Sequence, residues 1–463
     1  MALGLRFLPF FNRVEKAALS AVEAEVEWFC LPAGQTLFEE GEVADSFYLV
    51  RSGALAAFRT GADARPELVG HIRAGEPIGE MALVEDRPHS ASVYALRDSE
   101  LVRLPKAAFD KLTNKHASLM RELSKMMLSR IRTGESYRRS EPRVFALIST
   151  SPTIDLEYRS DLLKTALKEM GVSAVACGLE CADWPGPKLD VLEAEYDIVI
   201  LQARLGDSNW ARRAMARADR IWMMARADAR PSIPLMPEDP SPAAKLKLID
   251  VVMVHNEGVR KAAAPSEWID AADAARCFHW RQHNASDVRH MARTMAGKSV
   301  GLVLSGGGSR AYAHVGAIRA FKEAGVEFDF FGGASMGGII AAGAAMGWDN
   351  EELEDRMRRA FVASNPLSDW VMPVVSLTRG KRVDRRLKEH FGDVDIAELP
   401  RPFFCVSSNL STGATRIHRS GSLSRALRAS IAIPGLLPPI VDGDDVLVDG
   451  AVFNNFPIQE LKA

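Results

Sequence analysis

The residues with the clearest chemical potential form the pattern Gly333-Ala334-Ser335-Met336-Gly337, between an apolar-rich run at 326–331 and a small-residue run at 338–346. A serine at a sharp strand-to-helix turn exposes its hydroxyl, and only small neighbours fit around such an elbow. The helix that follows would direct its positive N-terminal end at the same place. The pattern therefore predicts a nucleophilic Ser335 with Gly333 and Gly337 as its elbow glycines, although five residues alone also match by chance.

A glycine-rich turn lies upstream of this serine. A strand predicted at 300–304 runs into Ser305-Gly306-Gly307-Gly308-Ser309-Arg310, and a helical pattern follows at 311–324. Successive glycines after a strand let backbone N–H groups converge on one point, as an anion-binding nest does. A nest beside an exposed hydroxyl supplies the oxyanion hole and the nucleophile that acyl transfer needs.

The same turn admits a rival interpretation. Gly306, Gly308 and Ala311 fit a dinucleotide-binding fingerprint, with Asp329 as the ribose partner. This Rossmann interpretation explains the turn but gives no reason for a serine elbow at the end of the next strand.

A base for the serine is offered by Asp449, which ends a short apolar run and precedes Gly450 and Ala451. A carboxylate on a glycine-flanked turn at a strand end can approach a serine without obstruction. The alternative is an ordinary Asp-Gly turn. A Ser-His-Asp triad through His314 is formally open, but local packing on its helix explains His314 better, and His390 and His418 fall in ordinary helical and strand contexts.

Three segments in this order resemble the patatin-like phospholipases, which are serine hydrolases with a Ser-Asp dyad, and most of all their neuropathy target esterase-like lysophospholipases. The segments are 305–316 (SGGGSRAYAHVG), 333–338 (GASMGG) and 449–457 (DGAVFNNFP). The resemblance spans 298 to the C-terminus. It implies Ser335 as nucleophile, Asp449 as base, and Gly306, Gly307 and Gly308 with Arg310 as the oxyanion element, with no metal or cofactor required.

This chain departs from the family pattern in three places. Ala311 and Ala451 stand where the family usually has glycine, and both changes are small enough to keep the geometry. Only 14 residues follow Asp449, which suggests a truncated hydrolase domain. The second hypothesis is therefore a catalytically silent regulatory or scaffold protein that keeps the fold.

Length and composition frame these motifs. The 463 residues predict about three domains, and 47% hydrophobic with 25% charged residues is typical of a globular protein. A net charge of −2 gives no reason to expect nucleic acid. Five scattered cysteines are unlike a disulfide framework and favour a reducing compartment, and Cys177 and Cys181 lack the further ligands of a zinc site.

The N-terminal part has its own character. Between 31 and 104 short apolar runs alternate with Gly and Pro turns, which predicts a small antiparallel barrel or jelly roll, with helices at 14–28 and 105–137. Residues 8–130 resemble a cyclic nucleotide-binding domain. The candidate nucleotide site comprises Gly79, Glu80, Arg87, His89 and Ser90.

That resemblance implies a glutamate at Glu80 for the ribose and an arginine for the cyclic phosphate. His89 occupies the arginine's place, and Arg87 would need a different loop path. A neutral histidine replaces a bidentate guanidinium poorly. A cyclic nucleotide effector is therefore open, and a degenerate regulatory or dimerisation domain is favoured.

The remaining expectations concern organisation and partners. We expect a multidomain α/β protein: a cyclic nucleotide-binding-like β jelly roll at 1–138, an α/β spacer at 139–292 without P-loop glycines or lysine, and a patatin-like α/β hydrolase domain at 293–463. A helix face with Leu119, Leu123, Met126, Met127 and Ile131 could pair in a homodimer or pack on its own barrel.

Lipid contact would be peripheral, because no apolar stretch is long enough to span a bilayer. The apolar run 370–375, followed by Arg379, Lys381 and Arg382, suits a membrane surface, while core packing explains the run about as well. We expect a phospholipid or lysophospholipid substrate and a location in the cytoplasm or on the cytoplasmic face of a membrane.

Overall fold

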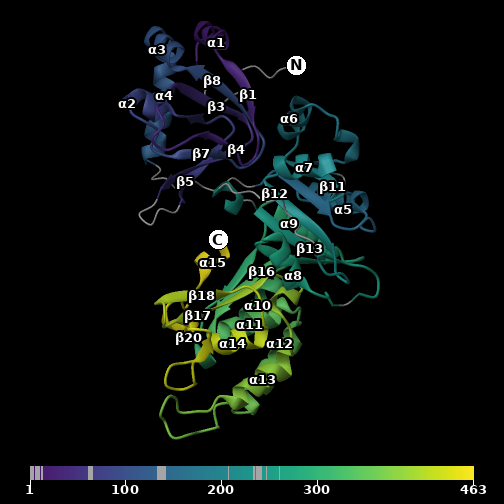
Figure 1. The fold of residues 1–463 in the computed structure, drawn as a ribbon. Coiled ribbons are helices and arrows are strands. Elements are labelled where there is room, and N and C mark those ends of the chain that lie inside the picture. Colours follow the sequence, from purple (N-terminus) through teal and green to yellow (C-terminus); the bar gives the residue numbers. More distant parts are fainter. Residues whose placement is uncertain are drawn as a thin grey trace. The chain divides into compact units, whose positions relative to one another are not determined.

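The computed structural model describes residues 5, 11, 14–60, 66–132, 142–206, 208–232, 235, 242–246, 248–259 and 261–462. The chain forms two compact units, Met1–Met223 with Met236–Ile249, and Met224–Leu235 with Asp250–Ala463, coloured along the sequence in Figure 1. The three domain boundaries expected from the sequence stay predictions, and the basic linker expected at 130–143 lies mostly outside the described residues.

The first unit begins with the β jelly roll that the sequence predicts. Its two four-stranded sheets have the orders β1-β8-β3-β6 and β2-β7-β4-β5. The strands are β1 (Glu27–Leu31), β2 (Thr36–Phe38), β3 (Ser46–Ser52), β4 (Ala54–Thr60), β5 (Pro66–Arg73), β6 (Pro77–Ile78), β7 (Ser92–Ala95) and β8 (Ser99–Pro105). The helix expected at 14–28 is shorter, α1 (Lys16–Glu23), because Trp28 pairs with Val102 across β1 and β8.

The helices after the barrel include the face for which the sequence left two alternatives, a homodimer or packing on its own barrel. They are α3 (Lys106–Lys115) and α4 (Ala117–Arg132), separated at His116, while α2 (Glu80–Glu85) lies between β6 and β7. On α4, Leu119 and Leu123 are 5% and 1% exposed within the unit's own core. Met126 and Met127 pack against that core. These four side chains therefore pack within their own unit. A homodimer stays a prediction, and it would have to use another surface.

The middle segment is the α/β layer expected from its apolar runs. In the first unit β10 (Ala174–Cys177), β11 (Ile198–Arg204) and β9 (Val144–Ser149) pair in parallel in that order. β13 (Leu248–His255), which lies in the second unit from Asp250 onward, and β14 (Arg276–Arg281) are also parallel. The accompanying elements are α5 (Leu156–Glu169), α6 (Gly186–Glu195), α7 (Ser208–Arg217), β12 (Arg220–Arg226), α8 (Pro265–Ala272) and α9 (Ala285–Met295).

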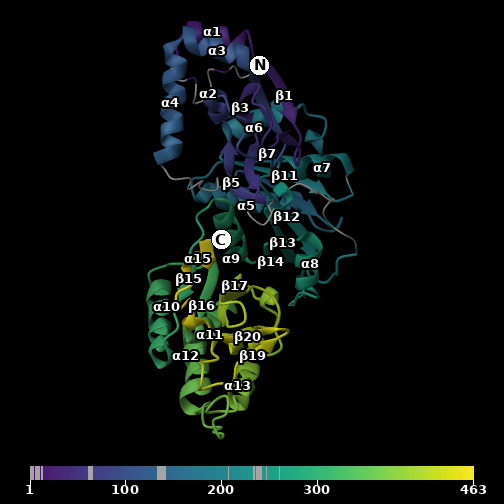
Figure 2. The same ribbon diagram turned by 60° about the vertical axis from the view of Figure 1, so that its left-hand side comes forward.

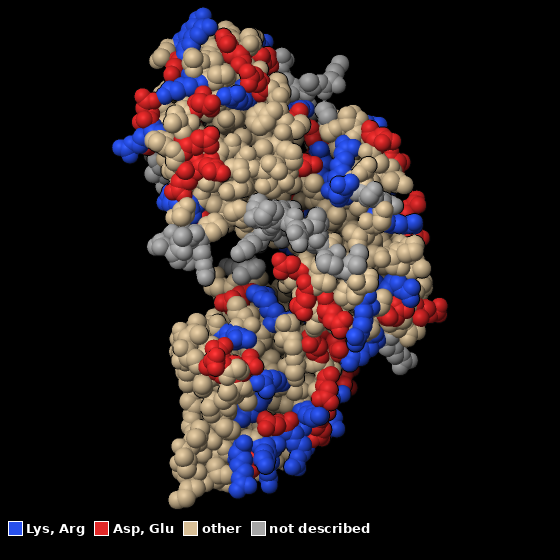
Figure 3. Space-filling model, viewed as in Figure 1, with Lys and Arg blue, Asp and Glu red and all other residues tan. Residues whose placement is uncertain are grey.

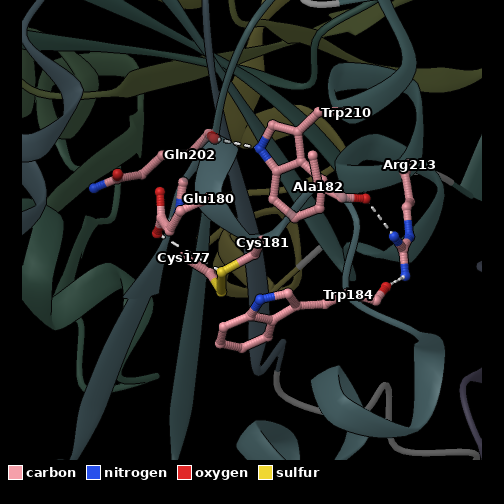
Figure 4. The surroundings of a disulfide bond; sticks show 9 residues. Cys177, Glu180, Cys181, Ala182, Trp184, Gln202, Trp210 and Arg213 are labelled. Atoms are coloured by element: carbon pink, nitrogen blue, oxygen red, sulfur yellow. Dashed lines mark hydrogen bonds between the residues drawn. A yellow bond between two sulfur atoms is a disulfide. The ribbon is translucent and has the colours of Figure 1, made fainter.

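Cysteine pairing differs from the expectation. Cys177 and Cys181 form a disulfide, with Cα atoms 6.0 Å apart (Figure 4). The pairing arises because Cys177 ends β10 and a short 3-10 helix, Leu179–Cys181, turns the chain straight back. The expectation of unpaired cysteines, which was based on their scattered spacing, is therefore wrong for Cys177 and Cys181. Glu180 lies within 4.8 Å of both sulfurs, but sulfurs joined in a disulfide are not thiolates and do not act as zinc ligands.

The C-terminal part of the second unit is a mixed sheet with helices packed on it (Figure 2). Its order is β15-β16-β17-β20-β19, with β18 also paired to β17. The strands are β15 (Gly301–Leu304), β16 (Phe330–Ala334), β17 (Phe403–Asn409), β18 (Ala414–His418), β19 (Ile440–Asp442) and β20 (Asp445–Asp449). The helices are α10 (Ala313–Glu323), α11 (Ser335–Ala345), α12 (Asn350–Met357), α13 (Lys381–Phe391), α14 (Leu423–Ser430) and α15 (Ile458–Lys462).

Apolar side chains explain why these elements pack as they do. One core joins one sheet face to α10–α14, with Ile318, Ile339, Leu387 and Leu427 among its fully buried members. The opposite face carries a smaller cluster of Ala334, Phe404 and Val406, against which Leu461 of α15 packs. No helix among the described residues is long and apolar enough to cross a membrane.

The central strand, β17, brings together two chain segments that are far apart in sequence. Along one edge of β17, Val406 pairs with Ala334, the last residue of β16. The next residue, Ser407, pairs with Asp449, the last residue of the antiparallel β20. Because β18 occupies the other edge of β17, β16 and β20 end head to head on neighbouring rungs of the same edge. The residue after Ala334 and the residue that ends β20 must therefore meet.

Candidate active site

The elbow at Ser335 has the geometry that its flanking glycines predict. Ser335 is a non-glycine residue with a φ of 52°, a left-handed conformation that costs about 1–3 kcal/mol and persists only when its surroundings impose it. A Cβ on Gly333 would lie 2.7 Å from the Leu304 carbonyl oxygen, and one on Gly337 2.4 Å from that of Ser305. These contacts are with backbone atoms, so both positions require glycine.

The two predicted catalytic side chains face each other. Ser335 Oγ donates a hydrogen bond to Asp449 Oδ2 at 2.7 Å. Asp449 Oδ1 accepts a second hydrogen bond from the Ala451 N–H at 2.8 Å, which fixes the carboxylate plane. The side chains are 5% and 4% exposed. Burial raises the pKa of Asp449 above its usual value, against the opposing hydrogen bonds from Ser335 and Ala451.

Two buried serines that the sequence analysis did not single out support this pair. Ser430, at the end of α14, accepts a hydrogen bond from the Ser335 backbone N–H at 2.9 Å, so it holds the strained elbow in place. Ser408 on β17 accepts one from the Phe453 N–H at 3.0 Å and braces the turn after Asp449. Their signal in the sequence was weak, because an isolated serine in a strand or helix shows no spacing to any partner.

The glycine turn lies directly beside Ser335. A Cβ on Gly306 would approach the Ser335 Cβ to 2.9 Å. Gly306 donates its N–H to the Asn455 carbonyl oxygen at 3.3 Å, and Arg310 donates its own to Gly307 at 3.1 Å. Within the described ranges of the chain, the N–H groups of Gly307 and Gly308 have no acceptor. Of the predicted oxyanion residues, these two therefore have N–H groups available for an anion, while the exposed Arg310 contributes turn geometry.

The histidines take structural positions. His314 Nε2 faces the Ser305 carbonyl oxygen at 3.0 Å and braces the glycine turn. His418 Nε2 lies 2.8 Å from Ser407 Oγ, and burial lowers the pKa of His418 to about 4. His390 lies in α13. Among the residues that the structure describes, none of the three forms a hydrogen bond with Ser335 or Asp449, so the arrangement is a dyad in geometry.

The Rossmann alternative fails on Asp329. Its buried carboxylate accepts hydrogen bonds from His290 Nδ1 at 2.8 Å, from the Arg293 guanidinium at 2.7 Å and from the Val300 N–H at 2.9 Å. The residue stands just before β16, at the opposite end from Ser335. A carboxylate engaged in this way is not available to a ribose.

The candidate nucleotide site of the jelly roll has a different character. Glu80 is 2% exposed at the start of α2, next to Gly79 with its φ of 81°. His89 is 6% exposed and stacks on Phe38, with ring centroids 3.6 Å apart. Burial lowers the pKa of His89, which favours the neutral ring. Arg87 and Ser90 are exposed on the surface beyond.

The alternative of core packing for the run at 370–375 is wrong. Trp370, Met372, Val374 and Val375 are 62%, 87%, 89% and 66% exposed. The basic residues that follow, Arg379, Lys381 and Arg382, are exposed as well.

Family models match three parts of the chain. Residues 29–116 match the cyclic nucleotide-binding domain, 179–300 the neuropathy target esterase family P-loop like domain, and 302–462 patatin-like phospholipase. The fold is thus an N-terminal cyclic nucleotide-binding jelly roll followed by α/β layers that end in a patatin-like domain.

Relatives extend the match over nearly the whole chain. An uncharacterized NTE family protein of Mycobacterium tuberculosis is 34% identical, over 99% of this chain and 78% of its own length. The lysophospholipase NTE1 of Cryptococcus neoformans is 26% identical, over 95% and 32%. Patatin-like phospholipase domain-containing protein 6 of Pongo abelii is 25% identical, over 98% and 37%. The chain belongs to the neuropathy target esterase (NTE) family.

Solved structures resemble the jelly roll. The cAMP-bound regulatory domain of Toxoplasma gondii PKA is 25% identical, over 27% of this chain and 47% of that one, with a TM-score of 0.25. The Thermus thermophilus catabolite activator protein is 22% identical, over 35% and 71%, with a TM-score of 0.26.

Proposed function

We propose that the patatin-like domain is a serine esterase that hydrolyses carboxylic esters of lysophospholipids or phospholipids. The observation that carries the proposal is the buried 2.7 Å hydrogen bond from Ser335 Oγ to Asp449 Oδ2, beside two backbone N–H groups with no acceptor among the described residues. A nucleophile, a base and an oxyanion hole are the complete set for acyl transfer.

In the acylation step Ser335 Oγ attacks the ester carbonyl carbon while its proton passes to Asp449. The raised pKa of Asp449, caused by burial, makes the carboxylate a stronger base than an exposed aspartate. The carbonyl oxygen becomes an oxyanion that the N–H groups of Gly307 and Gly308 stabilise, with the N-terminal end of α11 adding positive potential. The tetrahedral intermediate then expels the alcohol, which takes the proton from Asp449, and Ser335 carries the acyl group.

Deacylation reverses these roles with water. Asp449 takes a proton from a water molecule that attacks the acyl carbon, and the same N–H groups hold the second oxyanion. Collapse returns the proton to Ser335 Oγ and releases the fatty acid. The lysophospholipase and phospholipase relatives support a lipid ester as substrate. We expect the protein to act on this ester at a membrane surface, on the cytoplasmic face.

Variants of the dyad test this proposal directly. Ser335→Ala and Asp449→Asn should lower fatty acid release from a lysophosphatidylcholine by about 1,000-fold or more, because each removes a group used in every step. The melting temperature should change little. Ser420→Ala and Asp444→Asn are matched controls, since both residues are exposed. Release by Ser335→Ala at the wild-type rate would refute the assignment of the nucleophile.

A fluorophosphonate probe distinguishes the esterase from a silent scaffold. An activated serine reacts with the probe, while a serine without a working base does not. We expect labelling of the wild type and none of Ser335→Ala. An unlabelled, folded wild type would favour the scaffold.

A further inference from the structure

The loop between α12 and α13 presents an apolar surface of unusual exposure for a folded protein. Met372 and Val374 are 87% and 89% exposed, and Trp370 and Val375 exceed 60%. Scattered single apolar residues on a surface need no explanation, but a contiguous group marks an interaction site. We call residues 370–378 the apolar loop.

The apolar loop is held in shape rather than left loose. Trp370 and Thr378 form an antiparallel bridge. The Val371 N–H donates to the Leu377 carbonyl at 3.0 Å, and the Arg379 N–H donates to Asp369 at 3.0 Å. These bonds close a hairpin whose tip, 372–375, carries its apolar side chains outward. A surface fixed in this way needs little ordering when it meets a partner.

Basic residues surround the apolar loop. Between 358 and 388 the chain has eight arginines and lysines against two aspartates. Three of the eight pair with acids just outside this range: Arg359 with Asp355, Arg386 with Glu389 and Lys388 with Asp393. In the part of the chain that the structure describes, Arg379, Lys381 and Arg385 are exposed and form no ion pair. Figure 3 shows Lys and Arg side chains gathered beside an uncharged surface in the part of the second unit where Figure 1 places α13. Apolar tips with a basic surround match an anionic lipid surface in charge and polarity.

A short segment, 430–437, connects this surface to the dyad. At one end Ser430 Oγ accepts from the Ser335 N–H, and the Ala432 carbonyl accepts from the Asp449 N–H at 2.9 Å. At the other end the carbonyls of Gly435 and Leu436 accept from the N–H groups of the apolar loop at 2.8 and 3.1 Å. Within the segment Ile433 is 41% exposed, so apolar surface continues from the loop toward the nucleophile.

We propose that the apolar loop, together with the basic residues of α13, is the surface by which this protein docks on an anionic lipid bilayer and presents the Ser335–Asp449 site to it. The apolar tip enters the interface while Lys381, Arg385 and their neighbours contact lipid phosphates. The segment 430–437 then lies on the lipid side of the dyad. This inference rests on the proposed lipid esterase but concerns binding, which is measured separately from turnover.

The first test is sedimentation with phosphatidylcholine vesicles containing phosphatidylglycerol. Met372→Glu with Val374→Glu should weaken binding about tenfold or more, because two carboxylates replace apolar groups at the inserted tip. Val43→Glu is the control, since Val43 is 76% exposed in the jelly roll. Hydrolysis of a short, water-soluble ester should be unchanged in the double variant, while release from vesicle-borne lysophospholipid falls about tenfold.

The second test addresses charge. Lys381→Glu with Arg385→Glu should weaken binding to the anionic vesicles about tenfold at low salt and much less at high salt, where surface charges are screened. Ser335→Ala should bind vesicles as the wild type does, so a failure of the esterase proposal would leave this result intact. Two results would overturn the proposal: wild-type protein that does not sediment with the vesicles, or a Met372→Glu, Val374→Glu variant that binds as well as the wild type. The apolar loop would then be assigned to contact with a protein partner instead of a bilayer.

Discussion

The patatin-like domain and the jelly roll both match a family model, yet only one of them assembles the side-chain chemistry associated with its family. In the first, Ser335 and Asp449 meet as donor and acceptor beside the N–H groups of Gly307 and Gly308, which have no acceptor among the residues that the structure describes. In the second, the position of the phosphate-binding arginine holds His89, stacked on Phe38. We therefore expect the jelly roll to keep its fold without a cyclic nucleotide site, and each site has to be judged from its own residues.

Burial acts on both sites in the same direction with opposite consequences. Desolvation disfavours the charged form of any group. It raises the pKa of Asp449, which makes the carboxylate a better proton acceptor. It lowers the pKa of His89, which removes the positive charge that a cyclic phosphate needs. We therefore expect the same physical effect, burial, to favour proton transfer to Asp449 and to disfavour phosphate binding at His89.

The largest effect after loss of the dyad itself should come from Gly337→Ala. The added Cβ would sit 2.4 Å from the Ser305 carbonyl oxygen, so the elbow must move. We expect ester hydrolysis to fall about 100-fold or more, with a lower melting temperature. Gly316→Ala is the matched control, because nothing lies within 4 Å of its added Cβ and alanine favours a helix. Equal activity of the two variants would contradict the tight elbow.

Ser430→Ala should have an intermediate effect. The variant removes the acceptor of the Ser335 N–H without touching either member of the dyad. We expect kcat to fall about tenfold with KM almost unchanged, because the loss concerns the position of the nucleophile and not the binding of lipid. Ser430→Thr keeps a hydroxyl and should recover part of the rate. An unchanged kcat would show that Ser430 does not position the nucleophile.

The pH dependence should follow Asp449. Its carboxylate acts as a base only when deprotonated, and its pKa is raised by burial. An ordinary aspartate has a pKa of about 4. The acid limb of kcat/KM should therefore lie at a higher pH than this, and activity should be lost as the pH falls through the limb. Profiles measured on a soluble ester would locate the limb. A limb at or below the ordinary range would show that burial does not tune the base.

Stability has its own pH dependence and is the control for that profile. Burial lowers the pKa of His279 to about 4 and that of His418 likewise to about 4. Unfolded histidines bind protons near pH 6.5, so the unfolded state takes up more protons between pH 6.5 and 4. The stability from these neutral rings is complete above pH 6.5 and is lost as the pH falls toward 4. Melting temperatures across this range should show the decline.

The smallest effect should come from cyclic nucleotides. At about 1 mM, cAMP or cGMP should leave the melting temperature of the wild type unchanged, because no binding means no stabilisation. His89→Arg restores the positive charge expected at the phosphate-binding position and tests whether the rest of the nucleotide pocket is intact. A shift in the wild type would contradict the loss of the site, while a shift in His89→Arg alone would show that the rest of the pocket is intact.

Much of the site could be predicted because its signals are local. The glycines around Ser335 and the Asp449-Gly450 turn follow from what a tight backbone permits, and the β jelly roll follows from alternating apolar runs. Other features were not local. The pairing of Cys177 with Cys181 depended on a turn that spacing alone did not show. The exposure of Met372 and Val374 was undecided, because an apolar run looks the same in a core and on a surface.

By itself the sequence determined which residues can do chemistry here, since glycine permits a tight turn and serine and aspartate supply a hydroxyl and a carboxylate wherever they stand. Only the tertiary structure decided that they meet. Val406 and Ser407 are consecutive on β17, and their partners, Ala334 and Asp449, are brought onto neighbouring rungs from strands far apart in the chain. Strand register is set by pairing and packing across the whole sheet. It therefore cannot be predicted from the residue at any single position.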